Sequence, residues 1–117
     1  MQLPGTTLLV IDDDDHVRQR ISAHMERGGY DVLQARDASE GLAIFNAQRP
    51  GLVLCDLHLG DNSGFALVRE ITERDQDMPV IVISADGVMA DVVEALRLGA
   101  SDYLIKPLDD LVVLEHA

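Results

Sequence analysis

The feature that most constrains this chain is a short apolar run that ends abruptly at a carboxylate. Residues 52–55 are all apolar, Asp56 follows them directly, and polar and glycine residues continue as far as Gly64. A short apolar run bounded by turn residues is typical of a strand buried on both faces, as in a parallel sheet. Because a buried strand excludes charge from its interior, Asp56 is expected where the strand ends and a loop begins.

Three further apolar runs end in the same way. Residues 8–11 lead into four consecutive aspartates at 12–15, residues 80–83 lead into Ser84, and residues 103–105 lead into Lys106. The carboxyl ends of parallel strands share one edge of the sheet, and ligands of open α/β sheets bind at that edge. Each polar residue alone is explained as well by a helix cap or a surface group. Their repeated position favours one shared site.

Segments of helical periodicity separate these strands. Apolar spacing and cap signals predict helices over about 15–27, from Ser63, and over 88–98, with a further helix from the capping-box sequence 37–40 to just before Pro50. Asp14 is a candidate N-cap, Gly99 is expected just past the end of the helix over 88–98, and the more polar strand over 30–35 is placed near a sheet edge. The residues of the helix over 88–98 that are expected to face inward are Met89, Val92, Val93 and Leu96.

The strand–helix order, repeated five times, predicts a single α/β domain over residues 1–117. Such an order requires a parallel sheet with helices on both faces and right-handed crossovers. A last helix is expected from about Asp109, where the chain has room for only about two turns. We therefore expect this chain to be the N-terminal part of a longer protein.

Charge and composition exclude several classes of function. The formal net charge of −12 argues against direct binding of nucleic acid or of an anionic membrane by this domain. No apolar run approaches the roughly 18 residues that a membrane span needs, and no signal peptide is visible, so a cytoplasmic protein is expected. The single cysteine, Cys55, falls in a buried strand and has no partner for a disulfide within the chain.

The predicted edge brings Asp12, Asp13 and Asp56 together. Two like charges 4 Å apart repel each other by ~4 kcal/mol at an effective dielectric of 20, so the cluster must bind a cation or hold a proton. Hard oxygen ligands without thiolates favour Mg²⁺ or Mn²⁺ over zinc. The backbone carbonyl of His58, two residues past Asp56, is a further candidate ligand, and Lys106 adds a fixed positive charge.

This cluster suits phosphoryl chemistry. Asp56 as a nucleophile would give an acyl phosphate, with the metal and Lys106 neutralising the charges of both partners. The Ser84 hydroxyl and the Ala85 amide are placed to hydrogen-bond the phosphoryl oxygens.

From about Thr7 onward, the sequence resembles the receiver domains of two-component response regulators, the CheY-like group. The matching segments are Val10-Ile11-Asp12-Asp13-Asp14, Leu54-Cys55-Asp56, Ser63-Gly64, Val82-Ile83-Ser84-Ala85, Gly99-Ala100-Ser101-Asp102-Tyr103 and Lys106-Pro107.

The resemblance implies a flavodoxin-like sheet of order 2-1-3-4-5 and phosphorylation of Asp56 by a histidine kinase, a phosphotransfer protein or acetyl phosphate. It implies Mg²⁺ on Asp13, Asp56 and the His58 carbonyl, with Asp12 acting through water. Ser84 and Tyr103 would form the switch pair, Lys106 would contact the phosphate, and Lys106–Pro107 would be a cis peptide. Such a domain is not an enzyme beyond its own phosphorylation and dephosphorylation. It signals to an output domain or partner protein, sometimes as a homodimer.

A narrower likeness covers Met89-Ala90-Asp91 and residues 95–99, which are similar to receivers of the RssB type. That type delivers the stationary-phase sigma factor to a protease, so a sigma factor is an implied partner. One departure from the wider family is Gly60, which stands where a proline is usual and should loosen the loop after Asp56.

Three other functions fit parts of the sequence. A receiver-like adaptor would bind partners without phosphorylation. A phosphatase of the haloacid-dehalogenase type would use Asp12 as its nucleophile, although His16 stands where that class needs a residue like threonine. A flavodoxin-like cofactor binder would need a Ser/Thr/Gly-rich phosphate loop, whereas aspartates 12–15 would repel a phosphate there.

Overall fold

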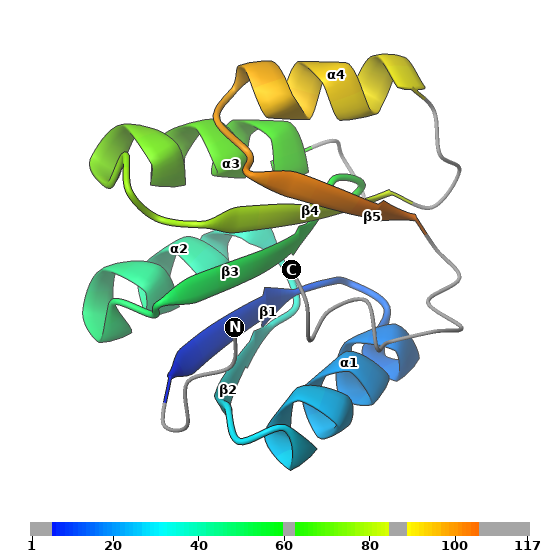
Figure 1. Ribbon diagram of the computed structural model, residues 1–117, viewed down its shortest axis with the longest axis vertical. Coiled ribbons are helices and arrows are strands. Elements are labelled where there is room, and N and C mark those ends of the chain that lie inside the picture. Colours follow the sequence, from blue (N-terminus) through cyan, green and yellow to red (C-terminus); the bar gives the residue numbers. More distant parts are fainter. Residues whose placement is uncertain (1–5, 60–62, 85–88, 106–117) are drawn as a thin grey trace.

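The computed structural model describes residues 6–59, 63–84 and 89–105. Within them a five-stranded sheet has the order β2-β1-β3-β4-β5, and every neighbouring pair is parallel (Figure 1). The expected strand order is confirmed. The strands are β1 (Thr7–Ile11), β2 (Asp31–Ala35), β3 (Leu52–Asp56), β4 (Val80–Ser84) and β5 (Asp102–Ile105).

Four helices connect the strands and cover both faces of the sheet. Figure 1 shows α1 on one face and α2, α3 and α4 on the other. The helices are α1 (Asp15–Arg27), α2 (Ala38–Gln48), α3 (Ser63–Arg74) and α4 (Met89–Arg97). The helix expected from about Asp109 lies outside the described residues. Among the helices that the structure describes, none combines the length and the apolar character needed to cross a bilayer.

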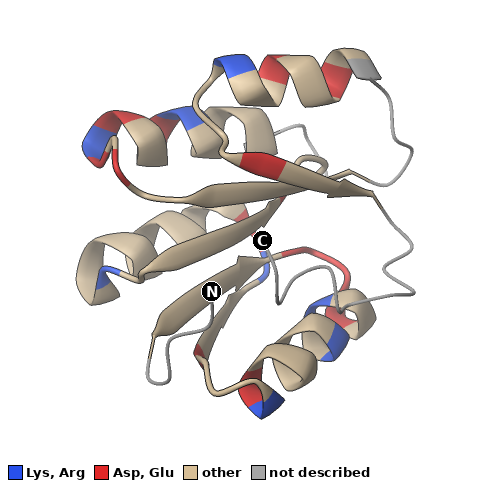
Figure 2. Cartoon of the chain, viewed as in Figure 1, with Lys and Arg blue, Asp and Glu red and all other residues tan. Residues whose placement is uncertain are grey.

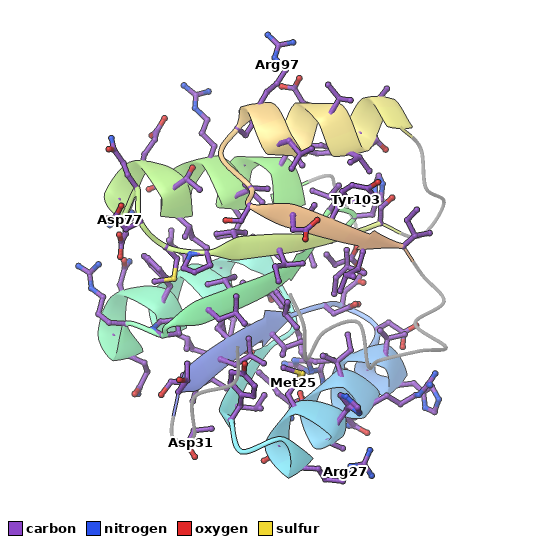
Figure 3. The ribbon with its side chains drawn as sticks, in the orientation of Figure 1. Met25, Arg27, Asp31, Asp77, Arg97 and Tyr103 are labelled. Carbon is purple, nitrogen blue, oxygen red and sulfur yellow. The ribbon has the colours of Figure 1, made fainter. Side chains whose placement is uncertain are left out.

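Alternate residues of the inner strands pack into two separate hydrophobic cores. In β1, Leu8 and Val10 pack with Ile21 and Met25 of α1, and Figure 3 shows Met25 between α1 and the sheet. Leu9 and Ile11 instead join the core under α2, α3 and α4. Burial on both faces explains why these strands read as unbroken apolar runs rather than as alternating ones.

Helix ends follow the predicted caps. The Asp14 side chain accepts hydrogen bonds from the backbone N–H groups of His16 and Val17, at 2.9 and 3.1 Å. At the far end of α4, Gly99 has a φ of 116°, and Ala100 N–H donates to the Ala95 carbonyl at 3.1 Å. This is the Schellman pattern, in which a glycine takes the left-handed position.

The predicted inward face of α4 is partly wrong. Val92 is buried as expected, but Val93 and Leu96 have 46% and 40% of their surface exposed. Ala95 is fully buried instead, so the packed stripe is rotated around the helix axis relative to the predicted one. Apolar residues occur on several sides of this nine-residue helix, so their spacing alone does not select the face that packs.

Candidate functional site

Three carboxylates meet at the carboxyl edge of the two central strands. Ile11 of β1 lies opposite Cys55 of β3, so Asp12 and Asp56 follow at the same level. Ligand atoms of Asp12, Asp13 and Asp56 all lie within 4.8 Å of one another. Figure 2 shows the acidic run directly after β1. The predicted cluster therefore forms.

Burial and hydrogen bonding differ among the three acids. Asp12 is fully buried and Asp56 is 2% exposed, whereas Asp13 is exposed to solvent. Asp12 Oδ1 accepts from the Asp14 backbone N–H at 2.9 Å, and Asp56 Oδ1 accepts from the His58 backbone N–H at 3.1 Å. These amides orient the two buried carboxylates. Two buried acids beside a third also repel one another, which favours a bound cation.

The buried guanidinium of Arg18 supports the same loop, a role that was not predicted from the sequence. Its Nη1 donates to the Asp12 backbone carbonyl at 3.0 Å, its Nη2 donates to Asp15 at 2.6 Å, and its Nε donates to Gln34 of β2 at 3.0 Å. The side chain thus joins α1, β2 and the acidic loop. Its spacing of three residues from Asp15 was the one local signal, and many exposed surface pairs share that spacing.

Ser84 follows the cluster on the next strand. Asp56 pairs with Ile83 of β4, so Ser84 is the following residue at that edge, and it is fully buried. Its hydroxyl has no hydrogen-bond partner among the described residues. Tyr103 of β5 lies level with Val82 and packs, half-buried, against the core under α4 (Figure 3).

Other predicted site residues lie outside the described part of the chain. They are Lys106 with Pro107, Ala85 and Gly60. The structure thus places Asp12, Asp13, Asp56 and Ser84 together at one edge of the sheet, with His58 two residues past the end of β3.

Gly64 lets the backbone of Asp56 and Leu57 lie close to the start of α3. A Cβ atom added there would lie 2.4 Å from the Asp56 carbonyl oxygen and 2.5 Å from the Leu57 carbonyl oxygen. Because both neighbours are backbone atoms, no rotamer change would relieve the clash. Glycine is therefore required for Asp56 to sit this close to the helix.

Cys55 belongs to the core, as predicted. It is fully buried, and its Sγ donates to the Asp56 carbonyl at 3.5 Å. Burial raises the pKa of the Cys55 thiol far above its usual range, and the neighbouring Asp56 and Asp12 carboxylates raise it further. The thiol stays protonated, so this site offers oxygen ligands rather than a thiolate. Such a donor set fits Mg²⁺ or a similar hard cation.

Comparison with known proteins identifies the matching family. The family model described as the response regulator receiver domain matches residues 8–117. The photosynthetic apparatus regulatory protein RegA of Cereibacter sphaeroides is 37% identical over 103 residues, which cover 88% of this chain and 56% of RegA. The regulatory protein PhoB of Pseudomonas aeruginosa is 34% identical over 106 residues, covering 88% of this chain and 46% of PhoB. The chain spans about half the length of these curated relatives.

Solved structures agree with that match. The receiver domain of NtrX from Brucella abortus superimposes with a TM-score of 0.85 at 33% identity, over 93% of this chain and 94% of that one. A response regulator from Burkholderia pseudomallei gives a TM-score of 0.86 at 32% identity, over 93% of this chain and 64% of that one. That crystal structure contains a phosphorylated aspartic acid, a calcium ion and citrate.

Proposed function

Because this chain belongs to the response regulator receiver domain family, we propose that Asp56 accepts a phosphoryl group in an Mg²⁺-dependent reaction. The observation that carries the proposal is the cluster of Asp12, Asp13 and Asp56 at the ends of β1 and β3, with ligand atoms within 4.8 Å. The phosphorylated aspartate and calcium ion of the Burkholderia pseudomallei relative support the same chemistry here.

In the proposed reaction an Asp56 carboxylate oxygen attacks the phosphorus atom of the donor. An O–P bond forms as the bond from phosphorus to the donor breaks, and its electron pair leaves with acetate or with the imidazole of a phosphohistidine. Asp13, Asp56 and the His58 carbonyl would hold Mg²⁺, with Asp12 acting through water. The metal supplies positive charge that offsets the repulsion between carboxylate and phosphoryl oxygens. Lys106 and the Ala85 amide would contact the phosphoryl oxygens.

Ser84 and Tyr103 form the proposed switch. The buried Ser84 hydroxyl has no acceptor among the described residues, and a phosphoryl oxygen on Asp56 would supply one. Movement of Ser84 toward that oxygen would free space for the half-buried Tyr103 ring and reshape the surface of α4 and β5. The change is a population shift, so a partner need only bind the phosphorylated form better. A Tyr103 rotamer that NMR finds unchanged by beryllofluoride, a phosphoryl mimic, would exclude this coupling.

The proposed partners are a histidine kinase or phosphotransfer protein as donor and an output domain or separate protein as receiver of the signal. The matched regions make up only 56% of the regulatory protein RegA and 46% of the regulatory protein PhoB, which supports an output function beyond the receiver. A sigma factor partner, homodimerisation and the absence of turnover on external substrates stay predictions from the sequence.

Intact mass spectrometry after incubation with acetyl phosphate tests the proposed function. We expect one added phosphoryl group that requires Mg²⁺ and is absent from Asp56→Asn. A gain that persists in Asp56→Asn but disappears in Asp12→Asn would indicate phosphatase-type chemistry at Asp12. If Mg²⁺ binds but neither acetyl phosphate nor phosphoramidate adds a group, the proposal fails and an adaptor that acts unphosphorylated is favoured.

A further inference from the structure

His58, two residues past the proposed acceptor Asp56, contacts both the Asp56 carboxylate and two helices. Its backbone N–H donates to Asp56 Oδ1 at 3.1 Å, while its ring Nε2 lies 3.3 Å from Oδ2 of Asp91 in the first turn of α4. The ring also meets Phe65 of α3 edge to face, with centroids 6.3 Å apart and an interplanar angle of 84°. His58 therefore contacts the acceptor carboxylate through its backbone, and it contacts both α3 and α4 through its ring.

We propose that Asp91 is a positioning residue for the phosphorylation site. By holding the His58 ring, Asp91 fixes the backbone of His58, so that the amide stays aimed at Asp56 Oδ1 and the carbonyl is held in place for the proposed metal. This inference rests on the proposed function of Asp56. It adds a role for a residue on α4, which α3 and β4 separate from His58 in the sequence, and which is not among the expected ligands of the metal or the phosphoryl group.

The backbone of His58 benefits from such a restraint. Holding the backbone of a residue in one conformation costs conformational entropy, and in the proposed function His58 presents both its N–H and its carbonyl to the site. The contacts of the His58 ring with Asp91 and Phe65 restrict this residue through its side chain.

The same contact joins the site to α4. Because a coupling free energy between two sites acts in both directions, a partner that moves the first turn of α4 would also change how readily Asp56 is phosphorylated. His58 and Asp91 retain 38% and 32% of their side-chain exposure. A pair this exposed is expected to change the rate by roughly two- to fivefold.

A double-mutant cycle on the full chain tests the proposal. The variants are Asp91→Asn, His58→Leu and both together, with Glu94→Gln on the same helix as the charge-matched control. Three quantities are measured: the phosphorylation rate from acetyl phosphate at saturating Mg²⁺, the Kd for Mg²⁺, and the ¹H–¹⁵N chemical shift of the residue 58 amide without metal. Asp91→Glu is included as the conservative rescue.

We expect Asp91→Asn and His58→Leu each to lower the rate by roughly two- to fivefold and to weaken Mg²⁺ binding, with the double variant no worse than either. The residue 58 amide signal should move in Asp91→Asn and return in part in Asp91→Glu. Removing a carboxylate near a site that receives an anionic donor would by itself raise the phosphorylation rate. A lower rate in Asp91→Asn would therefore reflect the loss of positioning and not the loss of negative charge.

Two results would overturn the inference. One is that Asp91→Asn changes the phosphorylation rate and the Kd for Mg²⁺ no more than Glu94→Gln does. The other is that the rate losses of Asp91→Asn and His58→Leu add up in the double variant. If no form is phosphorylated, wild type included, the proposed function fails. The amide shift and the Kd for Mg²⁺ in Asp91→Asn still decide whether Asp91 holds the loop.

Discussion

Gly64 and Asp56 show how closely the site depends on single atoms. A methyl group at residue 64 would lie 2.4 Å from the Asp56 carbonyl oxygen, so Gly64→Ala must displace the backbone that carries the acceptor carboxylate. We expect this variant to be phosphorylated by acetyl phosphate about tenfold more slowly or worse, because sub-ångström to ångström misplacement of a reacting group costs that much. Gly28→Ala is the control, since Gly28 has an ordinary φ of −82°. A wild-type rate in Gly64→Ala would contradict the close packing described.

Cys55 gives a prediction on pH dependence. Burial, with Asp56 and Asp12 adding to it, raises the pKa of the folded-state thiol. Below the ordinary thiol pKa of about 8.5 both folded and unfolded chains keep the proton. Above it only the unfolded chain loses the proton, so the free energy of unfolding falls as pH rises, by about 1.4 kcal/mol at pH 9.5.

Urea unfolding of wild type and Cys55→Ala at pH 7.5 and 9.5 isolates this contribution. The other ionisable groups are common to both proteins, so the difference between their two pH dependences belongs to the thiol. We expect wild type to lose more stability than Cys55→Ala on going to pH 9.5. Equal losses would mean that the folded thiol ionises as readily as the unfolded one.

At the scale of elements, Arg18 joins α1 and β2 to the acidic loop. Arg18→Met would leave the Asp12 carbonyl without its donor from Nη1 and would remove the bonds to Asp15 and Gln34. We expect the free energy of unfolding to fall by about 1–3 kcal/mol, the usual cost of leaving a buried polar group unsatisfied. Arg20→Met, an exposed position on the same helix with the same charge change, should change stability little. Equal effects of the two variants in urea unfolding would assign the loss to net charge alone.

The strands were predictable because their residues are buried on both faces, so each one appears as a local apolar run with a polar end. A shared edge then followed, since the carboxyl ends of parallel strands lie on one side of the sheet and bring Asp12, Asp56 and Ser84 there. The packed face of α4 was not predictable, because apolar residues on several sides of a short helix do not select one of them. Val93 and Leu96 are exposed for this reason.

Contacts between distant elements left no local signal. In the sequence Arg18 cannot be distinguished from an exposed arginine, because only the fold brings Gln34 of β2 and the Asp12 carbonyl beside it. The approach of His58 to Asp91 likewise depends on how α4 packs, because Asp91 lies 33 residues later in the chain. Pattern and spacing therefore located the acids and the hydroxyl of the site, while the residues that hold them in place required the three-dimensional structure.

For the whole molecule, a net charge of −12 and a cluster of carboxylates predict that a divalent cation stabilises the fold. A ligand that binds only the folded state adds about 2.7 kcal/mol when present at 100 times its Kd. Thermal unfolding should show a higher Tm in MgCl₂ than in NaCl of equal ionic strength. Asp13→Asn should unfold at a higher temperature than wild type without Mg²⁺, because repulsion is relieved, and should gain less from the ion. An equal gain in both proteins would place the cation elsewhere.

The most direct test of the central claim is to map the phosphorylated residue. After reaction with acetyl phosphate and Mg²⁺, borohydride reduces an acyl phosphate on aspartate to homoserine, which tandem mass spectrometry locates in the peptide. We predict homoserine at position 56 alone, and only when Mg²⁺ was present. Homoserine at position 12 or 13, or at no position in a protein that has bound Mg²⁺, would contradict the assignment of Asp56 as the phosphoryl acceptor.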